Sequence, residues 1–269
     1  MTARRESEFL STAIEAARRA AGIILGNLGR ISRDDIGVKQ AADFVTRVDR
    51  ESEAVIIETI RKRFPDHIFL AEESLKESGT DAHRWIIDPL DGTTNFIHGY
   101  PVFSVSIALE FRGEIIAGVI LDPSRNELFT GEKEQGAFLN GVSIRVSGVR
   151  DMQESLITTG FPFRRKDSLD SYLALFKGVF LRVSDLRRAG SAALDLAWLA
   201  CGRCEGFFEI GLSPWDIAAG SLLIREAGGT VTDFRGGPEY LTTGNIVAGT
   251  PSIHGELLKE VRGVFERTC

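Results

Sequence analysis

The 269-residue chain has only three cysteines, four histidines and two methionines, and it has no apolar run of 18 residues. The lack of such a run excludes a transmembrane helix, and the charged segment 1–6 does not resemble a secretory signal. An odd and small number of cysteines excludes a disulfide framework. With 43% hydrophobic residues, the chain is expected to be a cytoplasmic globular protein with a full core.

The few cysteines and histidines also argue against some kinds of site. Cys201 and Cys204 form a CxxC pair at the end of a predicted helix, but no second Cys/His pair completes a zinc site, so we interpret them as half-buried thiols. The histidines stand at no common metal-ligand spacing. A phosphohistidine mechanism through His98 is a disfavoured alternative.

The charge balance narrows the class of partner. Thirty-two basic and 38 acidic residues give a net charge of −6. A protein whose main partner is nucleic acid usually carries an excess of positive charge. We therefore expect a small-molecule partner, with neither nucleic acid nor membrane.

Periodicity predicts helices and an antiparallel meander in the first half of the chain. Apolar residues at helical spacing predict a helix over 7–28 and a second one that ends at Pro65. We interpret residues 31–42, which include Lys39, as a polar loop. Alternation with a period of two between Val102 and Ser147 predicts five antiparallel strands. Residues 1–150 are therefore expected to combine helices with an antiparallel sheet that carries the first metal motifs described below.

After about residue 150 the pattern changes to alternating strands and helices. The predicted strands are 155–160, 182–185, 206–210, 229–234 and 245–248, and the predicted helices are 168–180, 191–201, 216–227 and a last one from 252. No Pro/Ser-rich linker separates this α/β half, 151–269, from the first half. We expect the two halves to form one compact unit around a shared cleft.

One stretch of the first half combines carboxylates with an anion-binding turn. An apolar strand ends at Asp88, Pro89 prevents a normal continuation of the ladder, and Gly92 frees the backbone so that N–H groups can converge on an anion. Because Mg²⁺ is usually held by carboxylates plus phosphate oxygens, the stretch fits a metal-dependent phosphate site. The same residue types also make ordinary surface turns, so this stretch alone does not decide.

Three further acidic residues stand at the ends of predicted elements. Glu72 and Glu209 follow apolar strands, and Asp216 begins a helix, where a role as N-cap would suffice to explain it. Together, however, Glu72, Asp88, Asp91 and Asp216 would repel each other in one cleft unless cations neutralise them. The set therefore favours a divalent metal site.

Two long motifs carry a family resemblance. Residues 85–96, and residues 215–220 followed by 226–229, resemble the two signatures of the inositol monophosphatase family of Mg²⁺-dependent, lithium-sensitive phosphatases. Segments 43–49 and 72–74 match as well, and segments 159–164 and 187–193 are most similar to the bacterial inositol-1-monophosphatase branch. The resemblance covers nearly the whole chain. It implies an α+β fold, a layered α-β-α-β-α sandwich of the sugar-phosphatase type.

The resemblance implies a two-metal site. The implied ligands are Glu72, Asp88, Leu90 through its carbonyl, Asp91 and Asp216. Asp88 would bridge two Mg²⁺ ions, and the loop of Lys39 would carry a third, weaker one. The implied catalytic residues are Glu72 and Thr93, which position the attacking water, and Asp49, which orients Thr93.

The resemblance also implies how substrate is held. The implied substrate-binding residues are Leu90, Asp91, Gly92, Thr93, Arg187, Gly190, Ser191, Ala192, Glu209 and Asp216. Among these, the N–H groups of Gly92 and Thr93 would cradle phosphate, and Glu209 would accept hydrogen bonds from substrate hydroxyls. Arg187 would lie at the rim of the site or at a subunit contact.

The function that follows is an enzyme, a phosphoric monoester hydrolase. It would cleave myo-inositol monophosphate to inositol and phosphate by attack of metal-activated water, and it would be a homodimer. One alternative is fructose-1,6-bisphosphatase or another phosphatase of small phosphate esters. An alternative of another class is a non-enzymatic binding partner that keeps the phosphatase scaffold, although the four retained carboxylates argue against a purely non-enzymatic role.

Overall fold

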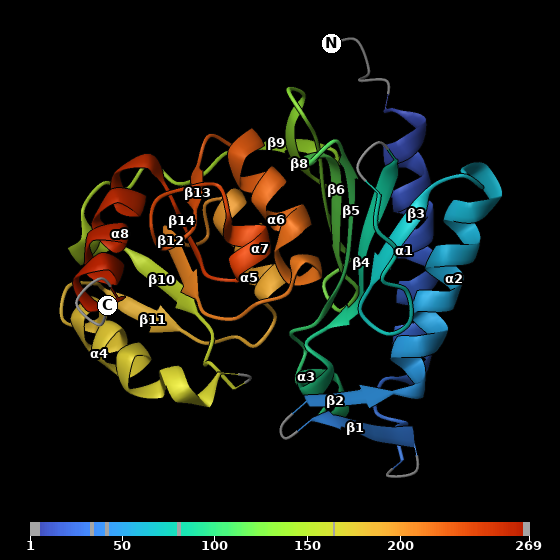
Figure 1. Ribbon diagram of the computed structural model, residues 1–269, viewed down its shortest axis with the longest axis horizontal. Helices are drawn as coiled ribbons and strands as arrows, with labels where there is room; N and C mark the ends of the chain where they lie inside the picture. The colour runs from blue at the N-terminus through green and yellow to red at the C-terminus, as the bar shows by residue number, and fades with distance from the viewer. Residues whose placement is uncertain (1–5, 33–34, 41–42, 80–81, 164, 266–269) are drawn as a thin grey trace.

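The protein is built from five layers in the order helix, sheet, helix, sheet, helix (Figure 1). The computed structural model describes residues 6–32, 35–40, 43–79, 82–163 and 165–265. Within these ranges no helix is both long enough and apolar enough to span a bilayer. The α-β-α-β-α sandwich predicted from the sequence is confirmed.

The first two layers are a helix pair and a seven-stranded sheet. Helices α1 (Glu8–Asn27) and α2 (Arg47–Arg63) pack on each other and on the sheet. Its strands, in spatial order, are β3 (Ile68–Ala71), β4 (His83–Asp91), β5 (Ser104–Phe111), β6 (Glu114–Asp122), β7 (Glu127–Glu132), β8 (Gly136–Leu139) and β9 (Val142–Ile144). Strand β3 runs parallel to β4, and the other neighbours are antiparallel.

Both faces of this sheet are covered, which explains the continuous apolar run of β4. Trp85 and Ile87 pack in the cluster that includes α1 and α2, whereas Ile86 faces α5 (Ala192–Ala200) and α6 (Pro214–Glu226). A strand buried on both faces loses the apolar–polar alternation of a half-exposed strand.

The second sheet lies on the far side of α5 and α6. Its strands, in spatial order, are β11 (Asp185–Arg187), β10 (Leu156–Thr159), β12 (Gly206–Glu209), β14 (Ile246–Gly249) and β13 (Thr230–Thr232). Strand β10 is parallel to β11 and β12, whereas β14 is antiparallel to both of its neighbours. Helices α4 (Leu169–Phe180) and α8 (Pro251–Phe265) cover the outer face (Figure 1).

Three expectations about local structure were wrong. Part of the expected loop 31–42 is a strand, β1 (Ile36–Gln40), which forms a two-stranded hairpin with β2 (Asp43–Thr46) outside both large sheets. The strand predicted at 182–185 is β11, three residues later. The short helices α3 (Thr93–Ile97) and α7 (Tyr240–Thr243) were not predicted, because one helical turn leaves no periodic pattern. The side chain of Lys39, and with it the predicted third metal, lies outside the described residues.

The expected division at residue 150 agrees with the origin of the sheets, since the first sheet uses strands before that point and the second uses strands after it. Helix α6 nevertheless belongs to the later half and packs on β4, β5, β6 and β7 of the earlier one. A Cβ at Gly118 in β6 would lie 3.2 Å from the Cα of Ala219 in α6. That the two halves fold as one unit stays a prediction, which this close packing supports.

The contact between α5 and α6 should be sensitive to a single methyl group. A Cβ at Gly220 would lie 2.5 Å from the Cβ of Leu196, so we expect Gly220→Ala to lower the free energy of unfolding by about 1–3 kcal/mol. The matched control is Gly22→Ala in α1, where a Cβ meets nothing within 4 Å and helix propensity predicts a gain of up to about 1 kcal/mol. Urea unfolding measures both variants. Equal stability of Gly220→Ala and wild type would contradict this packing.

Candidate active site

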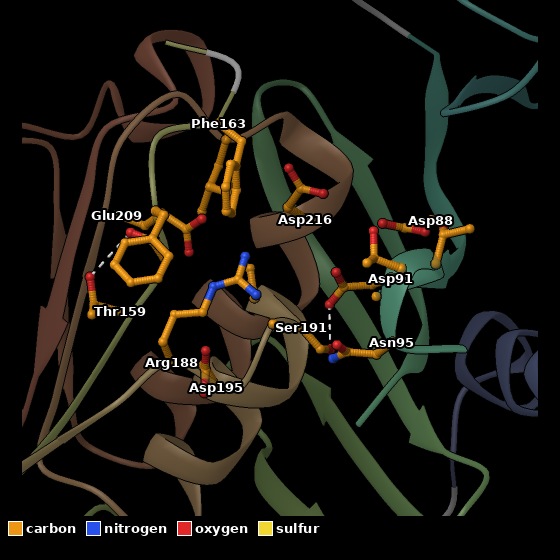
Figure 2. Close-up of a pocket in the computed structure, with 18 of the residues that line it drawn as sticks. Asp88, Asp91, Asn95, Thr159, Phe163, Arg188, Ser191, Asp195, Glu209 and Asp216 are labelled. Atoms are coloured by element: carbon orange, nitrogen blue, oxygen red, sulfur yellow. Dashed lines mark hydrogen bonds between the residues drawn. The ribbon is translucent and has the colours of Figure 1, made fainter. Parts of the chain in front are cut away.

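A cavity of about 380 Å³ lies between the two sheets, where β4, β10 and β12 end and α3, α5 and α6 begin. Its described lining includes six carboxylates and one guanidinium, which are Glu72, Asp88, Asp91, Asp195, Glu209, Asp216 and Arg188. Figure 2 shows Asp88, Asp91 and Asp216 on one side and Glu209 and Thr159 on the other, with Arg188 between them. The size is within the usual range for a small-molecule site.

An irregularity in β4 brings two of the acids together. Asp88 and Asp91 are an odd number of residues apart, so a regular strand would point them to opposite faces. Asp88 pairs with Ser106 of β5 and Asp91 pairs with Ser104, so β4 uses three steps where β5 uses two. This extra residue, next to Pro89, places both carboxylates in one cavity.

Asp216 joins them from the start of α6. The alternative role as N-cap falls to Ser213, and Asp216 is the third helical residue. The two form a capping box in which the Ser213 N–H donates to Asp216 Oδ2 over 2.6 Å. Carboxylate oxygens of Asp88, Asp91 and Asp216 all lie within 4.8 Å of one another, a spacing that fits a shared cation.

Burial and mutual repulsion make this acidic cluster costly to ionise. Burial, followed by the charges of Glu72, Asp91 and Asp216, raises the pKa of Asp88 well above its usual value. Burial raises the pKa of Asp91 to about 6, although hydrogen bonds from Ser191 Oγ (2.6 Å) and Ala193 N–H (2.8 Å) oppose the shift. Carboxylates that resist ionisation because they repel one another are suited to binding a divalent cation.

Thr93 stands next to this cluster in a fixed orientation. Gly92 precedes it with φ +93°, and a Cβ there would lie 2.9 Å from the carbonyl oxygen of Val102, so the turn requires glycine. The Thr93 hydroxyl donates to Asp49 Oδ1 over 2.8 Å, and Asp49 Oδ2 accepts from the Thr46 N–H at the start of α2. Asp49 does not line the cavity, and burial raises its pKa.

The opposite side of the cavity is built from three separate segments. Gly160 allows Glu209 to approach, since a Cβ there would lie 2.0 Å from Glu209 Oε1. Arg188 lies over the rings of Phe161 and Phe163, 5.5 and 5.2 Å from their centroids. Asn95 links the first motif to the loop before α5. Its amide donates to the carbonyl oxygens of Val102 and Ala189.

Nearly all the residues expected at the site line this cavity. They are Glu72, Asp88, Leu90, Asp91, Gly92, Thr93, Gly190, Ser191, Ala192, Glu209 and Asp216. Arg187 does not line it, because its guanidinium pairs with Asp185 and donates to the Leu186 carbonyl at the exposed end of the second sheet. The neighbouring Arg188 lines the cavity instead, and the alternative that Arg187 lies at a subunit contact stays a prediction. Arg164 lies outside the described residues.

Sequence reasoning missed Asn95, Arg188 and Asp195 as lining residues. Asp195 left a signal, because it is the one charged residue in the apolar helix Ala192–Ala200. Arg188 left none that distinguishes it from Arg187. Of the two thiols expected to be half-buried, Cys201 is partly buried whereas Cys204 is fully buried, and burial raises the pKa of both. His98 is not among the described residues that line the cavity.

A model of the inositol monophosphatase family matches residues 5–265. The chain belongs to this family. It is 50% identical over 255 residues to the Nus factor SuhB of Escherichia coli strain K12, covering 94% of this chain and 96% of that one.

Solved structures of the family agree with the fold. The extragenic suppressor protein suhB of Bartonella henselae is 43% identical, with a TM-score of 0.92 over 95% of this chain and 99% of that chain. The inositol monophosphatase of Anabaena sp. PCC 7120 is 44% identical, with a TM-score of 0.86 over 95% and 96% of the two chains. Family membership and fold class therefore agree with the resemblance seen in the two motifs.

The raised pKa of Asp91 predicts how stability depends on pH without metal. A carboxyl whose folded pKa is about 6 instead of 3.8 stabilises the fold while protonated, and this stability is lost as pH rises through 6. In EDTA, Asp91→Asn should therefore gain up to about 3 kcal/mol relative to wild type between pH 4 and pH 8. Urea unfolding at both pH values measures the difference. A constant difference would show that Asp91 ionises normally.

Proposed function

We propose that the protein is a Mg²⁺-dependent phosphomonoesterase that hydrolyses myo-inositol monophosphate. The observation that carries the proposal is the cluster of Asp88, Asp91 and Asp216 facing the turn at Gly92 and Thr93. Family membership supports a phosphatase, and the name of the Anabaena relative supports inositol monophosphate as the substrate.

The donor set fits Mg²⁺, which prefers carboxylate and carbonyl oxygens. Glu72, Asp88 and the Leu90 carbonyl would hold one ion, and Asp88, Asp91 and Asp216 a second. When bound, the ions supply positive charge that lowers the pKa of water and stabilises the leaving oxygen. Four carboxylates would balance two divalent ions, so the site would be close to neutral before phosphate binds.

Protein groups would position the attacking water and the phosphate. The Thr93 hydroxyl lies 2.8 Å from Asp49 Oδ1 and 3.1 Å from the Leu90 carbonyl oxygen, and when it donates to either one its oxygen would accept a hydrogen bond from the attacking water. Glu72, which also lines the cavity, would accept a second one. Water then attacks phosphorus opposite the ester oxygen, the P–O bond breaks, and the alcohol leaves with a proton. The Gly92 and Thr93 N–H groups would bind the phosphate oxygens.

The other side of the cavity would hold the alcohol. Glu209 lies close to Gly160, where a side chain would displace it, and it would offer acceptors for substrate hydroxyls. Phosphorylated sugars such as fructose 1,6-bisphosphate would use the same acidic cluster, so the choice of alcohol rests on Glu209 and its surroundings. Lithium sensitivity and a cytoplasmic location stay predictions.

The first test is phosphate release from inositol 1-phosphate, fructose 1,6-bisphosphate, phosphoadenosine phosphate and histidinol phosphate. We expect inositol 1-phosphate to have the highest kcat/KM in Mg²⁺. Both EDTA and Asp88→Asn should lower turnover at least about 10³-fold, because removing charge stabilisation from the transition state costs that order. Glu114→Gln, which removes an exposed carboxylate paired with Lys133, is the control and should keep wild-type activity. No turnover of any ester in Mg²⁺ would refute the proposal.

A matched pair of arginines tests the cavity itself. Arg188→Ala removes the one cation among the described lining residues, so KM for the anionic ester should rise and kcat/KM should fall about tenfold. Arg187→Ala removes the adjacent charge outside the cavity and should stay within about twofold of wild type. Steady-state kinetics on inositol 1-phosphate decide the question. A larger loss in Arg187→Ala than in Arg188→Ala would restore Arg187 as the substrate contact.

We also propose a homodimer. The exposed side of α4 and its end carry Leu173, Phe180 and Leu181, with exposed fractions of 48%, 58% and 72%, and a second copy could cover them. A second candidate function is a role with other macromolecules. It is supported by the names Nus factor and extragenic suppressor, since neither describes a hydrolase. Such a role would give the protein a macromolecular partner besides small molecules, and it would not require the acidic cluster.

A further inference from the structure

Asp195 lies in the wall of the cavity without an evident structural reason. It is 1% exposed, and its Oδ1 atom has no hydrogen-bond partner among the described residues. Figure 2 shows its carboxyl group below the Arg188 side chain, on the same side of the cavity as Glu209. A buried polar atom that stays unpaired costs about 1–3 kcal/mol, so Asp195 weakens the fold unless a ligand pairs with it.

Its helix gives the Oδ1 atom of Asp195 no partner either. Helix α5 is capped by Ser191, whose hydroxyl accepts from the Leu194 N–H, and Asp195 follows in the first turn, where a negative charge is favourable. The neighbouring positions Leu194 and Leu196 are fully buried apolar residues. For packing alone, alanine or leucine would suit position 195 better, because the unpaired Oδ1 atom is buried.

The charges around Asp195 are mostly of the same sign. Burial, with the charges of Glu209 and Asp91, raises the pKa of Asp195 well above its usual value, and Arg188 opposes the shift. A carboxyl group can pair with a hydroxyl in either state, because it accepts hydrogen bonds when ionised and both donates and accepts when protonated. Glu209, which also lines the cavity and lies close to Gly160, supplies acceptors on the same side.

These two groups suit an alcohol with neighbouring hydroxyls. Each hydroxyl both donates and accepts, so one can donate to Glu209 while the next pairs with Asp195. Phosphate is a poor ligand for this side, because two carboxyl groups would face its negative charge. The acidic cluster around Asp88 lies on the opposite side (Figure 2) and is left for metal and phosphate.

We propose that Asp195 is a specificity-determining residue, which forms with Glu209 a paired carboxyl subsite for two neighbouring hydroxyls of the substrate alcohol. This inference rests on the proposed phosphatase function. It extends that function because it assigns selection of a polyhydroxylated alcohol to a residue of α5 that has no role in metal or phosphate binding.

The test compares two esters that differ only in ring hydroxyls, inositol 1-phosphate and cyclohexyl phosphate, in Mg²⁺. The measured quantity is the ratio of their kcat/KM values. Asp195→Leu should lower this ratio at least about tenfold, because sites that pair with a hydroxyl discriminate strongly against its absence. Asp195→Asn preserves shape and some hydrogen bonding, so its ratio should fall about threefold and its KM for inositol 1-phosphate should rise. Cyclohexyl phosphate turnover should stay within about twofold in both variants.

Unfolding provides a readout that separates this role from a structural one. Because Oδ1 is unpaired, Asp195→Leu should unfold at the same or a higher urea concentration than wild type. The control is Asp233→Asn, since Asp233 is also buried but accepts from the Arg235 and Gly237 N–H groups away from the cavity. That variant should lose stability and keep the ester ratio.

The outcomes distinguish failure of the specificity role of Asp195 from failure of the proposed phosphatase activity. If the wild type hydrolyses both esters and the ratio stays within twofold in Asp195→Leu and Asp195→Asn, the specificity role is wrong while the phosphatase stands. Equal losses on both esters, together with reduced stability, would likewise assign Asp195 to structure. If the wild type hydrolyses neither ester, the phosphatase proposal fails and the specificity role falls with it.

Discussion

The cost of burying several carboxylates together governs the centre of this protein. Asp88, Asp91 and Asp216 are all less than a tenth exposed and lie within reach of one ion. The chain meets this cost with backbone donors: the N–H groups of Leu90, Ala193 and Ser213 each donate to one of the three acids. These bonds oppose the cost of burial without cancelling it, since burial still raises the pKa of Asp91 to about 6. A divalent cation would offset the remainder, so the same burial of negative charge that weakens the fold favours metal binding.

One sheet lies on each side of the acidic cluster, and helices α5 and α6 pack between the two sheets (Figure 1). The first residues of these helices bring Ser191 and Asp216 to the acids at the end of β4 and Asp195 to the side of Glu209 (Figure 2). Small residues permit the approach, since Gly118 and Gly220 leave no room for a Cβ. The packing of α5 and α6 therefore sets the positions of the site residues that they carry. A loss of packing there should displace the proposed metal ligands even when the ligands themselves are unchanged.

Much of the fold was predictable because its elements are long and periodic. The heptad-like spacing in 7–28, the alternation from Val102 and the α/β alternation after 150 each correspond to observed elements. The hairpin of β1 and β2 was missed because its strands pack in neither large sheet, so no buried face imposes a pattern on them. The alternative interpretation of Asp216 as an N-cap could not be decided from the sequence, because Ser213 and Asp216 both suit a helix start and only the backbone decides which residue is outside the helix.

The site was predictable to the extent that its residues are neighbours in the chain. Asp88, Asp91 and Thr93 share one turn, so their spacing reports their chemistry. The alcohol side is assembled from Gly160, Arg188, Asp195 and Glu209, which come from four elements or loops that no local pattern relates. Arg187 and Arg188 show the consequence, because adjacent arginines with identical chemistry differ only in which way the chain turns before α5. Short motifs thus indicate the proposed reaction class, whereas the residues that would select the alcohol are brought together by long-range packing and are found only in the structure.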